Sequence, residues 1–205
     1  MIRSVLAPNP GPFTLEGTRS WLVGETLMID PGPAIATHVH ALLAAQPRVA
    51  TILVTHRHAD HAPAAVEVAR RTGARILAPE DVLDDDLVSE RLVDGMRVEA
   101  EGLVIEAVAT PGHTSEHVCF LTSEGDLFTG DTILGEGTTV IFPPDGVMAD
   151  YMASLRRLRA LEPRAIYPGH GPIRTDAVAW IDYYIAHREE REAQILAALA
   201  DGPLG

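Results

Sequence analysis

The sequence lacks several features that are typical of particular classes of protein: it has a single cysteine, no lysine and no long apolar run. Cys119 is the only cysteine, so an intramolecular disulfide framework is excluded. It lies between apolar neighbours, which predicts a buried strand thiol and not a ligand or nucleophile. No apolar run is long enough to cross a bilayer, and the one before Pro8 is too short for a secretory signal. We therefore expect a soluble, cytoplasmic protein with no membrane partner.

Lysine is absent altogether. All sixteen basic residues are arginines, they are outnumbered by 29 acidic residues, and the formal net charge is −13. Such a charge disfavours non-specific binding to nucleic acid or anionic membranes, although a local cluster of arginines can still attract phosphate. An anionic group of a substrate must therefore be bound by arginine, by backbone N–H groups or by a metal ion. Most of the acidic surplus, such as residues 84–86 and 189–190, is typical of ordinary solvated surface.

The residues that are present predict a globular α/β protein. Hydrophobic residues make up 46% of the 205-residue chain, enough for a sizeable core in one domain over residues 1–205. Short apolar runs ending in turn residues predict strands at 20–23, 26–30, 50–55, 103–110, 117–122, 126–129 and 165–167. Apolar residues near helical spacing predict helices at 34–46, 62–72, 150–161 and about 175–200. Because strands occur in adjacent pairs, we expect mixed sheets with helices outside them, and 135–146 as the longest loop.

The densest group of potential metal ligands is His56, His58, Asp60 and His61. It directly follows a predicted strand and precedes a predicted helix, which places it in a turn at the carboxyl end of a strand. Open α/β folds bind ligands at such turns, and zinc accepts imidazole nitrogen and carboxylate oxygen at roughly 2.0 to 2.2 Å. One histidine alone would be expected on the surface or hydrogen-bonded in the core. Four donors within one turn instead favour a metal site.

Three further segments each place one potential ligand in a small-residue turn after an apolar strand. These ligands are His113, Asp131 and His170, and glycine precedes each of them. Glycine lets the backbone turn tightly and approach a metal ion. A structural zinc site closes with four ligands, often cysteines, whereas seven histidines and aspartates suit two ions with a position left for water. We therefore predict two zinc ions, with iron or manganese as alternative metals.

The pattern His-x-His-x-Asp-His at residues 56–61, followed by His113, Asp131 and His170, resembles the metallo-β-lactamase superfamily. Residues 9–12, 29–33, 110–114, 130–139 and 167–171 are similar to its β-lactamase-like protein 2 branch. The resemblance implies an αββα sandwich of two mixed sheets, a di-zinc site and, in some members, endoribonuclease activity on single-stranded RNA. It also implies that His56, His58 and His113 hold one metal, that Asp60, His61 and His170 hold the other, and that Asp131 bridges both.

A binuclear site of this kind predicts hydrolysis by a bridging hydroxide that attacks an ester, thioester, lactone or amide. Asp60 is the predicted catalytic residue, because a carboxylate beside that hydroxide can pass a proton to the leaving group. A small-molecule substrate is favoured by the negative charge of the chain. Cleavage of single-stranded RNA is the first alternative, and a mononuclear-iron dioxygenase or a non-catalytic metal-binding module are the others.

Several residues near these motifs have two interpretations. Asp30 is expected either to orient the histidine turn by hydrogen bonding or to cap its own turn. His117 is expected to pack at a strand end or to contact a ligand. Residues 135–139, including Glu136, are expected at the mouth of the site. The remaining histidines, His38, His40 and His187, are expected on solvated helix faces.

Overall fold

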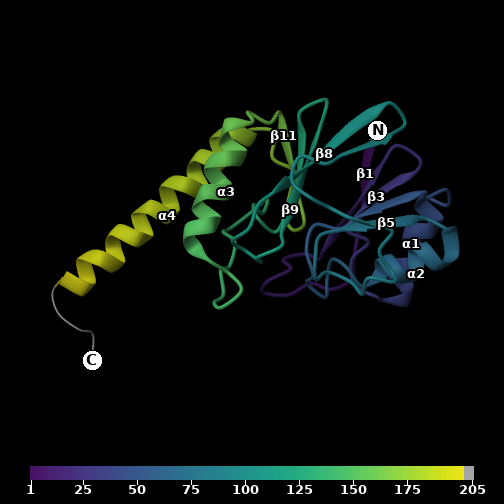
Figure 1. The fold of residues 1–205 in the computed structure, drawn as a ribbon. Helices are drawn as coiled ribbons and strands as arrows, with labels where there is room; N and C mark the ends of the chain where they lie inside the picture. The colour runs from purple at the N-terminus through teal and green to yellow at the C-terminus, as the bar shows by residue number, and fades with distance from the viewer. Residues whose placement is uncertain (201–205) are drawn as a thin grey trace.

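The computed structural model describes residues 1–200, which form two mixed β-sheets between two pairs of helices (Figure 1). The first sheet has the strand order β1-β2-β3-β4-β5-β6. The first three strands run antiparallel and the pairs from β3 to β6 are parallel. The bounds are β1 Ile2–Leu6, β2 Arg19–Val23, β3 Leu27–Ile29, β4 Thr51–Leu53, β5 Arg75–Ala78 and β6 Glu90–Arg91.

The second sheet has the order β11-β10-β9-β8-β7. Its strands pair antiparallel except for β10 and β11, which are parallel because α3 and the loop before it connect them. The bounds are β7 Arg97–Ala100, β8 Leu103–Ala109, β9 Val118–Thr122, β10 Asp126–Gly130 and β11 Ala165–Pro168.

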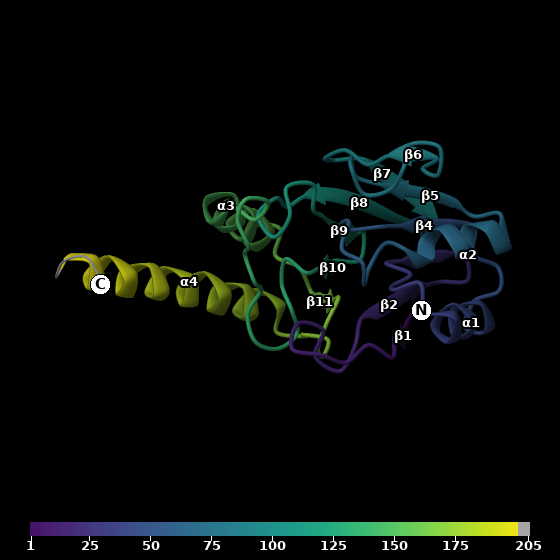
Figure 2. The same ribbon diagram turned by 90° about the horizontal axis from the view of Figure 1, so that it is seen from below.

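The helices are α1 Ala36–Ala45, α2 Ala64–Thr72, α3 Met148–Ala160 and α4 Ala177–Ala200. Figures 1 and 2 show α1 and α2 beside the first sheet and α3 and α4 at the opposite end of the molecule. The carboxyl-terminal half of α4 extends away from the body, and residues 189–197 are exposed. No helix within residues 1–200 combines the length and the apolar character that a membrane span requires.

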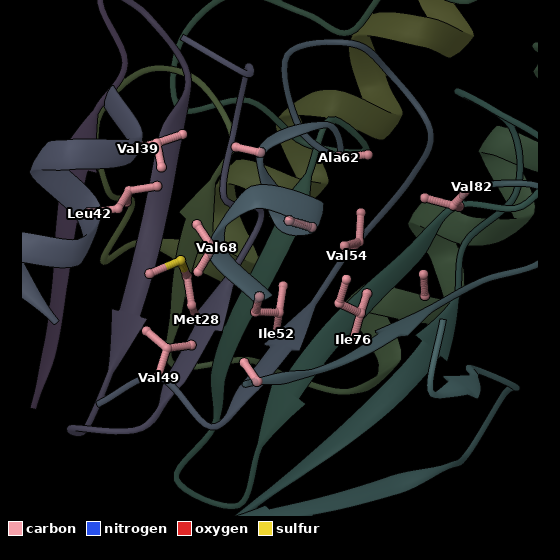
Figure 3. Packing of buried hydrophobic residues seen from close by; sticks show 14 of the residues in the cluster. Met28, Val39, Leu42, Val49, Ile52, Val54, Ala62, Val68, Ile76 and Val82 are labelled. Atoms are coloured by element: carbon pink, nitrogen blue, oxygen red, sulfur yellow. The ribbon is translucent and has the colours of Figure 1, made fainter. Parts of the chain in front are cut away.

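Alternation of side chains along the strands produces the layers. In β4, Ile52 faces α1 and α2 whereas its neighbour Leu53 faces the second sheet. Figure 3 shows the first of these layers, where Val39 and Leu42 of α1 and Val68 of α2 lie over the sheet. A second layer lies between the sheets, and a third lies between the second sheet and α3 and α4. The observed order is therefore helix, sheet, sheet, helix, which confirms the predicted αββα sandwich.

All four predicted helices and all seven predicted strands are present, with ends displaced by a few residues at most. Four further strands, β1, β5, β6 and β7, lie outside the sequence-based prediction. β1 and β7 carry charged or polar residues between their apolar ones, and β6 has only two residues. Their stability depends on pairing with neighbouring strands, which the local sequence does not record.

Candidate metal centre

The seven predicted ligands converge at one end of the two sheets. His56, His58, Asp60 and His61 follow β4 in the first sheet, whereas the other three follow β8, β10 and β11 in the second. Backbone hydrogen bonds hold these turns together: Val118 donates its N–H to the Thr55 carbonyl (3.0 Å), and Gly169 donates to the Gly130 carbonyl (2.8 Å). The centre therefore depends on the packing of both sheets.

Four side chains form the first group. His58 Nδ1 lies 3.0 Å from His56 Nε2 and 3.1 Å from His113 Nε2. Asp131 Oδ2 lies 3.7 Å from His113 Nε2 and 4.0 Å from His56 Nε2. Three imidazole nitrogens and one carboxylate oxygen thus surround one point, and this donor set can hold one metal ion.

The second group is Asp60, His61 and His170. Asp60 Oδ2 lies 3.4 Å from His61 Nε2 and 3.3 Å from His170 Nε2, and the two ring nitrogens are 3.4 Å apart. The other oxygen of Asp131, Oδ1, lies 3.3 Å from both ring nitrogens. This donor set can hold a second ion.

Within residues 1–200, Asp131 is the carboxylate that faces both groups. It is 8% exposed, and its Oδ1 is a buried oxygen without a hydrogen-bond donor. A buried carboxylate oxygen without a donor is costly unless a cation offsets its charge. The two oxygens of Asp131 therefore fit a pair of divalent ions, one on each side of the carboxylate.

The outer nitrogens of four of the histidines are hydrogen-bonded away from the centre. His113 Nδ1 lies 2.8 Å from the Val140 carbonyl and His170 Nδ1 lies 3.2 Å from the Gly17 carbonyl. A carbonyl only accepts, so each of these Nδ1 atoms carries the proton, and a neutral ring then presents an unprotonated Nε2 to the centre. His61 Nδ1 lies 2.9 Å from Asp30 Oδ2, and His56 Nδ1 lies 2.9 Å from Thr55 Oγ1.

The charges of the two groups differ in the metal-free protein. Burial, together with the neighbouring His61 and His117, holds the pKa of His56 well below its ordinary value. Burial alone would also lower the pKa of His170, but the carboxylates of Asp131 and Asp60 outweigh it and raise that pKa to about 9. His170, in the second group, therefore carries a proton in the metal-free protein, and a metal ion must displace that proton.

Asp30 supports the histidine turn, as the first of its two interpretations predicts. Its Oδ1 accepts the Thr55 N–H (2.8 Å), and its Oδ2 accepts the Thr55 hydroxyl (2.7 Å) and lies against His61 Nδ1. One buried carboxylate thus orients both ends of the turn. Thr18, which the sequence does not single out, donates its hydroxyl to Asp60 Oδ2 (2.9 Å).

Two of the remaining histidines are buried. His117 Nε2 lies 3.3 Å from the Asp131 N–H, and its Nδ1 contacts the hydroxyls of Thr110 (3.0 Å) and Thr132 (3.1 Å), so it supports the turn that carries Asp131. The prediction of a solvated face is wrong for His38. It is 1% exposed and contacts Ser20 Oγ and the Pro31 carbonyl, each at 3.0 Å, because its side of α1 packs against the turn after β3.

His40 is exposed, as predicted, whereas His187 is only half-exposed and stacks on Tyr183 of α4.

The Cys119 thiol is buried in β9, as predicted, and burial raises its pKa to about 12. A thiol with this pKa stays protonated at neutral pH, so it is a poor ligand and a poor nucleophile.

Gly169 allows the closest approach of backbone to the centre. A Cβ atom at this position would lie 2.6 Å from His61 Cε1 and 2.7 Å from Asp131 Oδ1. Any larger residue would therefore displace a ligand. The sequence prediction that glycine lets the backbone approach the metals holds at this position in particular.

A cavity of about 460 Å³ opens beside the centre. Asp60, His58, His113, Asp131 and His170 form its floor. The predicted mouth residues 136–139 line it, which confirms that part of the sequence prediction, and Glu136 is exposed there. Two wall segments were not expected at the site from the sequence: residues 12–15 before β2, and Val140 and Phe142 in the loop before α3.

The comparisons with known proteins agree with this geometry. The model of the metallo-beta-lactamase superfamily matches residues 14–170. The chain is 36% identical over 214 residues to a beta-lactamase-like protein 2 homolog from Caenorhabditis elegans, and the match covers 98% of the chain and 71% of the relative.

Two other matches bear on activity and metal. An atrochrysone carboxyl ACP thioesterase from Aspergillus fumigatus is 37% identical over 207 residues, which cover 95% of the chain but only 64% of the thioesterase. A crystal structure solved in a di-iron-bound form superimposes with a TM-score of 0.68 at 27% identity, over 86% of this chain and 96% of that one.

Proposed function

The chain belongs to the metallo-β-lactamase superfamily, in its β-lactamase-like protein 2 branch, and we propose that it uses two zinc ions to hydrolyse an ester or thioester. That it is a metal-dependent hydrolase follows from the family and from its cluster of histidines and aspartates. The number and identity of the ions, the ligand assignment and the bond that is cleaved are proposals.

The observation that carries the proposal is the position of Asp131 between two separate donor groups. His56, His58 and His113 would hold one ion and Asp60, His61 and His170 would hold the other, while Asp131 faces both groups. Nitrogen and oxygen donors without sulfur also suit iron, and the di-iron neighbour makes iron the first alternative metal.

When bound, two divalent ions supply a water molecule of lowered pKa and polarise the carbonyl oxygen of the substrate. The residues of the chain position the groups that take part in this reaction. Asp60 borders the cavity, and its Oδ2 is held in place by the Thr18 hydroxyl. Hydrogen bonds from His170 and His61 outweigh burial and keep the pKa of Asp60 far below its ordinary value, so Oδ2 is ionised. From its position beside the cavity, this carboxylate can relay a proton between the attacking water and the leaving group.

Cleavage of an ester or thioester is favoured over the other bonds by the thioesterase relative, which is 37% identical to this chain over 207 residues. A lactone or amide would use the same groups. Single-stranded RNA receives less support, because the part of the cavity wall within residues 1–200 contains no arginine to bind phosphate.

Metal content and hydrolysis measured on the same purified protein test the proposal. Elemental mass spectrometry should find about two zinc ions per chain, and chelator-sensitive cleavage should occur with a thioester or ester from a panel that also holds a lactone, an amide, a β-lactam and single-stranded RNA. Asp131→Asn should lose metal and activity together, whereas the exposed Asp86→Asn should keep both. One iron per chain with no hydrolysis would instead favour the dioxygenase alternative.

A further inference from the structure

The part of the cavity that lies beyond the metal ligands has an apolar wall. Its apolar members come from three separate segments of the chain, which meet only in the folded protein. They are Pro12, Phe13, Leu15, Leu134, Val140 and Phe142. A substrate whose reacting carbonyl lies at the centre must extend its next group along this wall.

Within residues 1–200, the cavity wall away from the metal ligands also lacks a cation to bind an anionic substrate group. Beyond those ligands, the charged side chain that lines this wall is that of Glu136, which is acidic. The arginine of the histidine motif, Arg57, is turned to Glu116 (2.9 Å) and Asp145 (2.5 Å). A carboxylate or phosphate on the substrate would therefore meet repulsion and no ion pair away from the centre.

Two large aromatic side chains of this wall are exposed. Phe13 is 65% exposed and Phe142 is 66% exposed, and their rings meet edge to face with centroids 6.5 Å apart. Exposed apolar side chains that are grouped at a cavity typically mark a binding surface, because a ligand removes them from water.

Hydrogen bonds hold both aromatic segments relative to the metal centre. On one side, the Val140 carbonyl lies 2.8 Å from Nδ1 of the ligand His113, and Phe142 accepts the Gly146 N–H (2.7 Å). On the other side, Thr14 donates its hydroxyl to the backbone carbonyl of Asn9 (2.6 Å), and the side-chain oxygen of Asn9 accepts the Thr18 N–H (2.9 Å). The distance between the reacting carbonyl and the aromatic pair is therefore set by the fold.

We infer that the acyl group of the substrate is uncharged and apolar, and that Phe13 and Phe142 bind it and determine its preferred length. The inference rests on the proposed ester or thioester hydrolysis. In that reaction water adds its hydroxyl to the acyl carbon, the carbon–sulfur bond breaks, and the thiol takes the remaining proton. The acyl group leaves as a carboxylic acid.

The first test compares S-acyl N-acetylcysteamines from acetyl to octanoyl on the zinc-loaded protein. We expect kcat/KM to rise by up to about fourfold for each added methylene until the cavity is filled. Adipoyl, which matches hexanoyl in length but ends in a carboxylate, should be cleaved at least tenfold less efficiently than hexanoyl. Equal rates along the series, or a preference for adipoyl, would overturn the inference.

The second test uses Phe13→Ala and Phe142→Ala. Both side chains are exposed, so their removal should leave the fold intact, lower kcat/KM for hexanoyl about tenfold and change that for acetyl less than twofold. The matched control is Tyr183→Ala, which removes an exposed aromatic ring of α4 that lies outside the cavity lining. Equal losses for acetyl and hexanoyl would contradict a role in acyl binding.

A binding measurement separates failure of this inference from failure of the proposed reaction. Methyl alkyl ketones cannot be hydrolysed, and calorimetry should show tighter binding to the wild-type protein as the chain lengthens, with the gain lost in Phe142→Ala. Length-dependent binding without any hydrolysis would reject the proposed reaction but retain the apolar acyl site. Hydrolysis with no dependence on chain length in either assay would retain the proposed reaction but reject the apolar acyl site.

Discussion

At the scale of single residues, the centre depends on groups that do not themselves face the cavity. Asp30 has a positive φ of 47°, and its buried carboxylate contacts three groups of the histidine turn. A non-glycine residue in this left-handed conformation carries strain, which its three contacts offset. Asp30 therefore fixes the ring of His61 before any metal binds.

Asp30→Asn tests this role. The substitution replaces one carboxylate oxygen by an NH2 group, which donates hydrogen bonds and does not accept them. This group would face either the Thr55 N–H or the Thr55 hydroxyl, both of which are donors to Asp30 in the wild-type protein. We expect about 1 to 3 kcal/mol lower stability from the group left unpaired, and roughly 10- to 100-fold weaker metal binding. Urea unfolding and zinc titration measure the two effects. Unchanged zinc affinity would show that Asp30 only caps its own turn.

The raised pKa of His170, about 9, predicts that metal binding depends on pH. At pH 7 the metal-free ring is protonated, and the ion must displace that proton. Zinc affinity should therefore increase by up to about tenfold per pH unit from pH 7 toward pH 9. Competition with a fluorescent zinc chelator measures it, and a flat profile over this window would contradict the raised pKa.

The raised pKa of His170 also predicts that the metal-free protein becomes less stable as the pH rises. The pKa of this histidine is higher in the folded state than the ordinary value of 6.5, so the stabilisation is fully present below about pH 6.5 and is lost as the pH rises through about 9. The free energy of unfolding of chelated protein should fall over this window. Urea titrations at several pH values provide the measurement, and a rise in stability would reject the prediction.

At the scale of secondary-structure elements, one of the ligand turns is tied to a helix from a later part of the chain. The turn after β8 lies against α3: a Cβ atom on Gly112 would lie 2.3 Å from Tyr151 Cα, and Val147 donates its N–H to the Gly112 carbonyl (3.0 Å). The neighbouring His113 is a proposed ligand. The packing of α3 on the second sheet therefore influences the position of that ring.

Gly112→Ala should disturb this contact. Its φ of +134° and the backbone of Tyr151 leave no room for a methyl group, so α3 must move, and we expect a loss of about 3 kcal/mol in stability. Gly95→Ala is the matched control, since Gly95 also has a positive φ but faces open space, and should cost about 1 kcal/mol. Urea unfolding compares them, and equal losses would show that backbone strain alone is responsible.

At the scale of the whole molecule, the centre joins the two sheets. The first sheet supplies His56, His58, Asp60 and His61 through one turn, and the second supplies the remaining three ligands through three turns. Bound ions would thus link elements that otherwise meet through the apolar layer between the sheets. Removal of metal should weaken the molecule as a whole and not one loop alone.

Chelation of the loaded protein tests this link. A free metal concentration of 100 times Kd stabilises the folded state by about 2.7 kcal/mol, which corresponds to roughly 5 to 10 °C in Tm for a chain of this size. Calorimetry with and without chelator should show this decrease, and Asp131→Asn should show little further decrease. An unchanged Tm in the wild-type protein would mean that the ions do not join the sheets.

The sequence by itself determined the parts of this protein that depend on local patterns. The ligand residues stand in short turns after apolar strands, and the apolar spacing of the helices repeats every few residues, so both are recorded within a few neighbouring positions. The alternating burial of Ile52 and Leu53 follows from the geometry of a strand in the same way. The family pattern of residues 56–61 added the αββα order of layers, which the structure confirms.

Only the tertiary structure decided features that depend on contacts between distant segments. His38 is buried because Ser20 and Pro31 lie beside it, although its helix carries no local sign of this. The distances that divide the ligands into two groups, and the apolar wall that joins Phe13 to Phe142, likewise arise between segments far apart in the chain. Such contacts form only when the sheets pack, because no local preference of either segment specifies its partner.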